Sequence, residues 1–361
     1  ISEGYASVEV DVRTGERGQR IKSVEKLLCE LTGAEAAAVV NNNAAATMLA
    51  LSAMAEGREV IVSRGQLIEI GGSYRLPDVM ECSGAKLREV GTTNKTHLFD
   101  YQRAINEETG ALLKVHPSNF EVVGFTKTVS TKEMVALASE HDLPVIDDVG
   151  SGALIDFSEF GLMDEPVVSQ SIKDGADVVL FSGDKLIGGP QCGIIIGKRK
   201  YIDTILSNPL MRAMRVDKMT LAALSATLLI YRDENRARTE IPILRMLSMP
   251  KENLKLRAEK IVAQLSHLGE LEICEAVEAD SMLGGGSLPT QKLSTWCVAL
   301  TPKTQSVDRL AAGLRNGEPS VIGRVQKERF FLDMRTVQPS QDSGLVESIE
   351  AYCDESNSEA E

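Results

Sequence analysis

Short apolar runs alternate with helical segments through the first part of the chain, and this alternation most constrains the fold. Seven runs have the composition of strands: 37–40, 59–63, 86–90, 111–116, 143–146, 176–181 and 192–196. Strand–helix–strand repeats of this kind predict an α/β fold, with a mostly parallel sheet and helices on both faces. Ligands of such sheets bind beyond the carboxyl ends of the strands.

Polar residues follow three consecutive predicted strands. Asn119, Asp148 and Lys185 stand at these strand ends, separated by 29 residues (148 − 119) and 37 residues (185 − 148). Each separation is long enough for one crossover between parallel strands. Because these strands end at the same edge of a sheet, we expect the three side chains to lie close together.

Lys185 belongs to the segment FSGDKLIGGPQ, residues 181–191. A lysine amine can hold an aldehyde cofactor as a Schiff base, and the Ser182 hydroxyl three residues earlier can reach a phosphate. A single lysine beside a turn is more often only an exposed surface residue. The interpretation therefore depends on the neighbouring strand ends.

A second candidate loop, Asn41–Asn43, joins a short strand to an alanine-rich helix. This arrangement points backbone N–H groups and the positive end of the helix at an anion, so Asn42, Asn43 and Ala44 are candidate phosphate ligands. An asparagine that only caps the helix fits the loop equally well.

Together these residues predict a site for pyridoxal 5′-phosphate. An aspartate beside the pyridine nitrogen keeps the ring protonated, Asn119 would hydrogen-bond the phenolic oxygen, and Lys185 would carry the aldehyde. Asp147 and Asp148 point to opposite faces of their strand, so alternation alone leaves open which of them meets the ring.

Composition limits the other classes of function. The net charge of −13 argues against a broad nucleic-acid-binding surface, and no apolar run reaches the ~20 residues of a membrane span. The six cysteines show neither a C-x-x-C pair nor a metal-ligand spacing, so we expect reduced thiols, no metal site and a cytoplasmic location.

The chain of 361 residues is long enough for two domains. We expect a large cofactor-binding domain over residues 1–209. A linking helix, predicted to run from 210 to 233, and a smaller α+β domain would occupy residues 210–352. Residues 353–361 are acidic and predict a disordered tail.

Beyond these patterns, the sequence closely resembles the bacterial L-seryl-tRNA(Sec) selenium transferase family, whose members are fold-type I pyridoxal phosphate enzymes. The matching segments are 40–46, 62–72, 75–79, 89–94, 148–152, 181–191, 215–224, 286–289 and 321–324. The resemblance implies that Lys185 forms the aldimine, and that Asp148, within the family pattern D-x-G-S-G, is the partner of the ring nitrogen.

The arginines gain a role only through the resemblance. Arg212 and Arg215 are three residues apart on a predicted helix and would share a face, which by itself suggests a solvated basic edge. The resemblance implies that they bind the anionic selenium donor together with Arg17. Arginine forks suit such an oxyanion. Arg64 would instead serve the cofactor phosphate.

The function implied is the conversion of seryl-tRNA(Sec) to selenocysteinyl-tRNA(Sec), with selenophosphate as donor. Members of the family begin upstream with a small helical tRNA-binding domain that this sequence lacks, and tRNA would bind mainly through it. They assemble as homo-oligomers, by resemblance a decamer, with active sites at dimer interfaces.

The alternatives are a paralogous lyase acting on a free small amino acid or amino sugar acid, and a catalytically inactive oligomerisation module. The intact Asn119, Asp148 and Lys185 argue against the latter.

Overall fold

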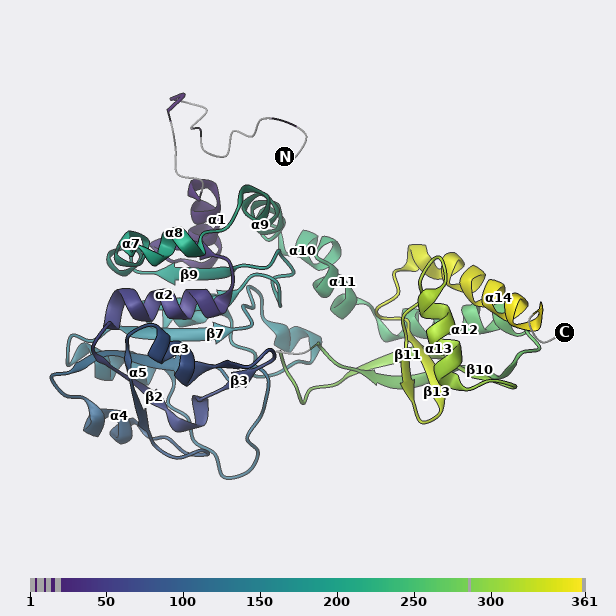
Figure 1. Ribbon diagram of the computed structural model, residues 1–361, viewed down its shortest axis with the longest axis horizontal. Helices are drawn as coiled ribbons and strands as arrows, with labels where there is room; N and C mark the ends of the chain where they lie inside the picture. Colours follow the sequence, from purple (N-terminus) through teal and green to yellow (C-terminus); the bar gives the residue numbers. More distant parts are fainter. Residues whose placement is uncertain (1–3, 5–9, 11–13, 17–20, 285–286, 359–361) are drawn as a thin grey trace. The chain divides into compact units, whose positions relative to one another are not determined.

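The computed structural model describes residues 4, 10, 14–16, 21–284 and 287–358. The chain divides into two compact units (Figure 1). The large unit comprises Ile1–Ile243 with Gly284–Thr290, and the small unit comprises Leu244–Leu283 with Gln291–Glu361.

A seven-stranded sheet with the order β1-β9-β8-β7-β6-β2-β5 forms the centre of the large unit. Its strands are β1 (Ala36–Val40), β2 (Glu59–Ser63), β5 (Lys86–Val90), β6 (Thr109–Val115), β7 (Val145–Gly150), β8 (Val178–Ser182) and β9 (Gly193–Gly197). Neighbouring strands pair in parallel along the part of the sheet formed by β8, β7, β6, β2 and β5. Strand β9 is antiparallel to both β8 and β1. The predicted mostly parallel sheet is therefore confirmed.

Helices cover both faces of this sheet. Successive side chains of each strand point to opposite sides, and those of the buried strands are apolar on both sides, so each face packs against helices. Val60 and Val62 pack with Leu49 in one apolar cluster, whereas Ile61 packs with Met134 in another. The helices of the large unit are α1 (Lys22–Thr32), α2 (Asn43–Ala55), α3 (Leu76–Cys82), α4 (Leu98–Ala104), α5 (Thr131–Ser139), α6 (Val168–Lys173), α7 (Arg199–Ser207), α8 (Leu210–Met214), α9 (Lys218–Ile230) and α10 (Glu234–Glu240). No helix among the described residues is long and apolar enough to cross a membrane.

The small unit is an α+β structure, as the sequence predicted. Its sheet has the order β10-β11-β13-β12, and every pair is antiparallel. Its elements are β10 (Leu271–Ser281), β11 (Leu293–Pro302), β12 (Arg324–Gln326), β13 (Arg329–Asp333), α12 (Lys251–Leu265), α13 (Val307–Asn316) and α14 (Asp342–Ser358). Helix α11 (Pro242–Ser248) spans the boundary between the units.

Helix α14 corrects the prediction of a disordered tail. The helix continues through Ser358, so the acidic segment from residue 353 is helical up to that point. Its start carries the apolar residues Leu345, Val346 and Ile349, which are buried in the core of the small unit and anchor the helix there. Residues 359–361 lie outside the described residues.

The single linking helix predicted over residues 210–233 is wrong. Helix α8 ends at Met214, and Arg215 adopts an extended conformation whose backbone pairs with Val40. Helix α9 then begins anew, because the Asp217 side chain caps it by accepting the N–H groups of its first turn.

The boundary between the units also lies later than the sequence placed it, at residue 243 rather than 209. Helix α9 packs against α1, and Tyr231 just beyond it donates a hydrogen bond to the Ile187 carbonyl at 2.9 Å. Residues 210–243 thus belong with the large unit.

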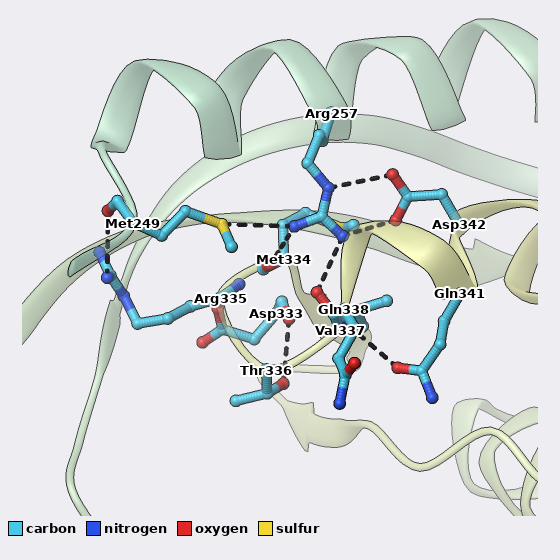
Figure 2. Close-up of polar contacts among 10 residues, drawn as sticks. All are labelled: Met249, Arg257, Asp333, Met334, Arg335, Thr336, Val337, Gln338, Gln341 and Asp342. Carbon is cyan, nitrogen blue, oxygen red and sulfur yellow. Dashed lines mark hydrogen bonds and ion pairs between the residues drawn. The ribbon is translucent and has the colours of Figure 1, made fainter. Parts of the chain in front are cut away.

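A half-buried arginine joins three parts of the small unit (Figure 2). The Arg257 guanidinium of α12 contacts both carboxylate oxygens of Asp342, at 3.0 Å and 2.5 Å. It also donates to the carbonyls of Met334 and Val337, each at 2.8 Å. Only 13% of the Arg257 side chain is exposed, so its loss would leave the carboxylate and both carbonyls without this donor.

We predict that Arg257→Met lowers the free energy of unfolding by about 3 kcal/mol, as expected when one partner of a largely buried ion pair is removed. Urea denaturation measures this loss. The matched control is Glu259→Ala on the same helix, which breaks a half-exposed pair with Lys255 and should cost less than about 0.5 kcal/mol. Equal effects of the two substitutions would contradict the assigned role of Arg257.

Candidate active site

A cavity of about 290 Å³ lies where strands β6, β7 and β8 end at their carboxyl edge. This volume is near the lower end of the ~300–1,000 Å³ typical of ligand pockets. The strand ends and the start of α2 contribute most of its polar wall: Asn42, Asn43, Ala44, His116, Ser118, Asp148, Ser182, Asp184 and Lys185. The cavity therefore lies at the edge that the strand pattern predicted.

The lysine loop is fixed by its own backbone. Strand β8 is wholly buried and ends at Ser182, and the following loop closes with hydrogen bonds from Gly188 to the Lys185 carbonyl at 3.0 Å and from Gly189 to the Gly183 carbonyl at 2.9 Å. A Cβ atom at Gly183 would lie 2.4 Å from the Cys192 sulfur, so the loop can pass here only without a side chain. Both Ser182 and Lys185 thereby reach the cavity wall.

The start of α2 has the predicted anion-binding form. The Asn42 side chain accepts the Ala45 N–H at 2.8 Å, which caps the helix, while the N–H groups of Asn43 and Ala44 have no acceptor within the helix. The asparagine cap and the anion site are therefore compatible. Strand β9 begins against this loop, because a Cβ atom at Gly193 would lie 2.1 Å from the Asn42 carbonyl oxygen.

The structure distinguishes the two aspartates of β7. Asp148 faces the cavity and accepts hydrogen bonds from Asn43 Nδ2 at 2.9 Å and Thr47 Oγ1 at 3.0 Å. Asp147 points to the opposite face, where it accepts a hydrogen bond from Thr131 at 2.8 Å and pairs with Lys114 at 3.7 Å. Burial raises the pKa of Asp148 to about 6, although its two hydrogen bonds oppose the rise.

His116 lines the cavity at the end of β6 and is neutral near pH 7. Burial lowers its pKa to about 4, and the positive charge of Lys114 acts in the same direction. Its backbone N–H donates to the Asp148 carbonyl at 2.9 Å, which holds the two strand ends together.

Two predicted cofactor ligands lie outside the cavity wall. Asn119 donates to the Glu69 carbonyl at 2.8 Å, and its neighbour Ser118 lines the cavity instead. Arg64 pairs with Glu89 at 2.7 Å and is not among the lining residues. Its side chain is 43% exposed.

The predicted anion-binding arginines are not brought into the cavity wall either. Arg212 and Arg215 are both exposed, and they do not share a helical face because α8 ends between them. The backbone of Arg215 nevertheless lies beside Val40, directly before the loop that starts α2. Arg17 lies outside the described residues.

Several lining residues were not singled out from the sequence. Asp184 and Ser118 adjoin predicted site residues, so their positions beside Lys185 and Asn119 were the available signal. Tyr74 comes from a short hairpin of β3 (Glu69–Ile70) and β4 (Tyr74–Arg75). Nothing in the local sequence indicated that Tyr74 would line the cavity.

The lining residues fit the predicted cofactor. Asn43 Oδ1 and Ser118 Oγ are buried and have no hydrogen-bond partner within the described part of the chain. Both belong to residues of the cavity wall, so a polar ligand there would satisfy them. The same wall offers a lysine, a buried carboxyl group and the start of a helix.

Known proteins similar to this chain were found by sequence and by structure. Residues 1–338 match the family model of L-seryl-tRNA selenium transferase. The L-seryl-tRNA(Sec) selenium transferases of Maridesulfovibrio salexigens and Geobacter sulfurreducens are 54% and 52% identical to it, each over 96% of this chain and 75% of the relative. A solved D-glucosaminate-6-phosphate ammonia-lyase resembles 96% of the chain, and 92% of its own, with a TM-score of 0.63 and 19% identity, which concerns the fold alone.

The predicted fold class, a fold-type I architecture with a smaller α+β domain, is therefore confirmed. The family model covers most of the chain, and the curated relatives share about half of its residues. This chain belongs to the L-seryl-tRNA selenium transferase family.

Proposed function

We propose that this chain converts L-seryl-tRNA(Sec) to selenocysteinyl-tRNA(Sec), with pyridoxal 5′-phosphate as cofactor and selenophosphate as selenium donor. The observation that carries the proposal is the meeting of Lys185, Asp148 and the start of α2 in one cavity of a chain from this family. Family membership favours this reaction over the alternative of a lyase acting on a free small amino acid or amino sugar acid.

Each part of the cavity would hold a different part of the cofactor. The N–H groups of Asn43 and Ala44, with the Ser182 hydroxyl, would bind the phosphate, and Lys185 would hold the aldehyde carbon. When bound, the cofactor supplies an electron-withdrawing ring that labilises the α-hydrogen of an amine substrate.

Asp148 would hold a proton at the ring nitrogen. A carboxyl group with a raised pKa becomes ionised again beside a positive charge, because opposite charge favours its charged form. The hydrogen bonds from Asn43 and Thr47 fix the carboxylate in that position. Asp148 would thus keep the ring protonated throughout the reaction.

Lys185 would move the substrate proton. Its amine, on a loop whose backbone is fixed, would remove the α-hydrogen of the seryl group and later return it. Over the whole reaction, the β-hydroxyl of the seryl group leaves and selenium from selenophosphate takes its place.

The selenium donor is an oxyanion, and we assign it to Arg212 and Arg215, with Arg17. In support, both residues are exposed, and the Arg215 backbone adjoins the segment that leads into α2. Binding of the tRNA and assembly into a homo-oligomer, with active sites at dimer interfaces, complete the proposal.

The cofactor assignment is tested by Lys185→Ala. The chain incubated with pyridoxal phosphate should gain a visible absorbance band that survives gel filtration, and Lys185→Ala should lose it, because Lys185 supplies the amine of the described cavity wall. The control is Lys173→Ala, which removes an exposed lysine of α6 and should leave the band unchanged. A covalently bound cofactor that persists in Lys185→Ala would contradict the assignment.

The two aspartates of β7 provide a second test. Asp148→Asn should still bind the cofactor but slow α-proton exchange of seryl-tRNA at least a hundredfold, because a neutral amide cannot keep the ring protonated. Asp147→Asn should slow exchange only a few-fold, since its hydrogen bond on the far face is worth ~1 kcal/mol. Mass spectrometry of the exchanged seryl group measures the exchange rate of both variants. A slower exchange in Asp147→Asn than in Asp148→Asn would refute the assignment.

The donor site is tested by replacing Arg212 and Arg215 with alanine, singly and together. Each loss of a charge-assisted contact costs ~1.5–3 kcal/mol, so the selenophosphate kcat/KM should fall roughly tenfold or more per arginine while the cofactor spectrum stays unchanged. Arg236→Ala, which breaks an exposed pair with Glu240, is the control. Wild-type donor kinetics in the double variant would remove both residues from the site.

A further inference from the structure

A buried carboxyl group lies behind the lysine loop, outside the cavity wall. Glu165 is only 8% exposed and sits in the segment between a short 3-10 turn (Phe157–Phe160) and α6. This segment is tied to the loop that follows β7, because Val168 N–H donates to the Ala153 carbonyl at 2.9 Å. No step of the proposed reaction uses Glu165.

Ser151 connects Glu165 to the loop that carries Lys185. The Ser151 hydroxyl donates to Glu165 Oε1, and the Ser151 carbonyl accepts the Leu186 N–H at 3.2 Å. The next residue, Gly152, packs so closely that a Cβ atom there would lie 2.8 Å from the Ser182 carbonyl oxygen. A shift of the Glu165 carboxyl would therefore be transmitted to the lysine loop.

Glu165 also interacts electrostatically with Lys185. Burial raises the pKa of Glu165 to about 7, and the positive charge of Lys185 opposes this rise together with the Ser151 hydrogen bond. Lys185 likewise acts on Asp148 at the end of β7 and on His116 at the end of β6. Glu165 Oε2 is buried and has no hydrogen-bond partner among the described residues, so this half of the carboxyl group is uncompensated.

We propose that Glu165 is a positioning residue for the cofactor lysine: through the hydroxyl and carbonyl of Ser151 it fixes the loop that carries the Lys185 amine. One oxygen of the buried carboxyl group accepts the Ser151 hydroxyl, and the Ser151 carbonyl accepts the Leu186 N–H directly after Lys185. This inference rests on the proposed role of Lys185 in binding the cofactor.

The test follows capture of pyridoxal phosphate by the cofactor-free chain, monitored by absorbance. Glu165→Ala removes the acceptor of the Ser151 hydroxyl and should slow capture at least fivefold, because the Lys185 loop is no longer held in place. Glu165→Gln keeps an acceptor oxygen at the same position and should recover most of the wild-type rate.

The control is Asp164→Asn, which removes an exposed carboxylate from the neighbouring position. Asparagine tolerates the positive φ of 66° found there, and solvent screens the lost charge. Its capture rate should equal that of the wild type. A purely structural Glu165 would lower the melting temperature in Glu165→Ala while leaving the capture rate of the folded chain unchanged, and that result would overturn the inference.

Two further outcomes are distinguishable. Failure of the wild-type chain to capture pyridoxal phosphate would contradict the proposed function itself rather than the role of Glu165. If Glu165→Ala does not fold, Ser151→Ala breaks the link to the lysine loop with a smaller change. It should slow capture at least fivefold, and wild-type rates in this variant would overturn the positioning role.

Discussion

The parallel pairing of β7 with β8 is the constraint on which the site depends. Asp148 is aligned with Leu180 in this register, which places the carboxyl ends of the two strands side by side. The lysine loop and the aspartate therefore meet although 37 residues separate them (185 − 148). The backbone ladder of the sheet brings the two strand ends together, and the glycine-dependent loop after β8 then places Lys185 at the cavity.

Much of the large unit could be predicted because its signals are local. Strands buried on both faces are continuous apolar runs, and the residue after each run is placed by the sheet edge. This logic found Asp148, Ser182 and Lys185, all of which line the cavity. The same reasoning was wrong by one residue after β6, where Ser118 rather than the predicted Asn119 lines the cavity. At that position the chain has left the strand, so alternation no longer fixes direction.

Features that depend on distant contacts could not be predicted. The break between α8 and α9 follows from the pairing of Arg215 with Val40, and the local signal for it is a single capping residue, Asp217, within an otherwise helical pattern. Burial of Glu165 likewise depends on the neighbouring loops, because a glutamate in a connecting segment is ordinarily exposed. The choice between Asp147 and Asp148 was available only through the family pattern until the strand's orientation was known.

Adjacent acids on one strand give the two faces of the sheet a common electrostatic environment. Asp147 faces α5 and is paired with Lys114, yet its negative charge also raises the pKa of Asp148 on the cavity side. The two side chains are adjacent in sequence, so the charge of Asp147 acts on Asp148 across the backbone of the strand. A substitution at Lys114, whose charge also lowers the pKa of His116, would therefore change the acidity of the cavity from the opposite face of the sheet.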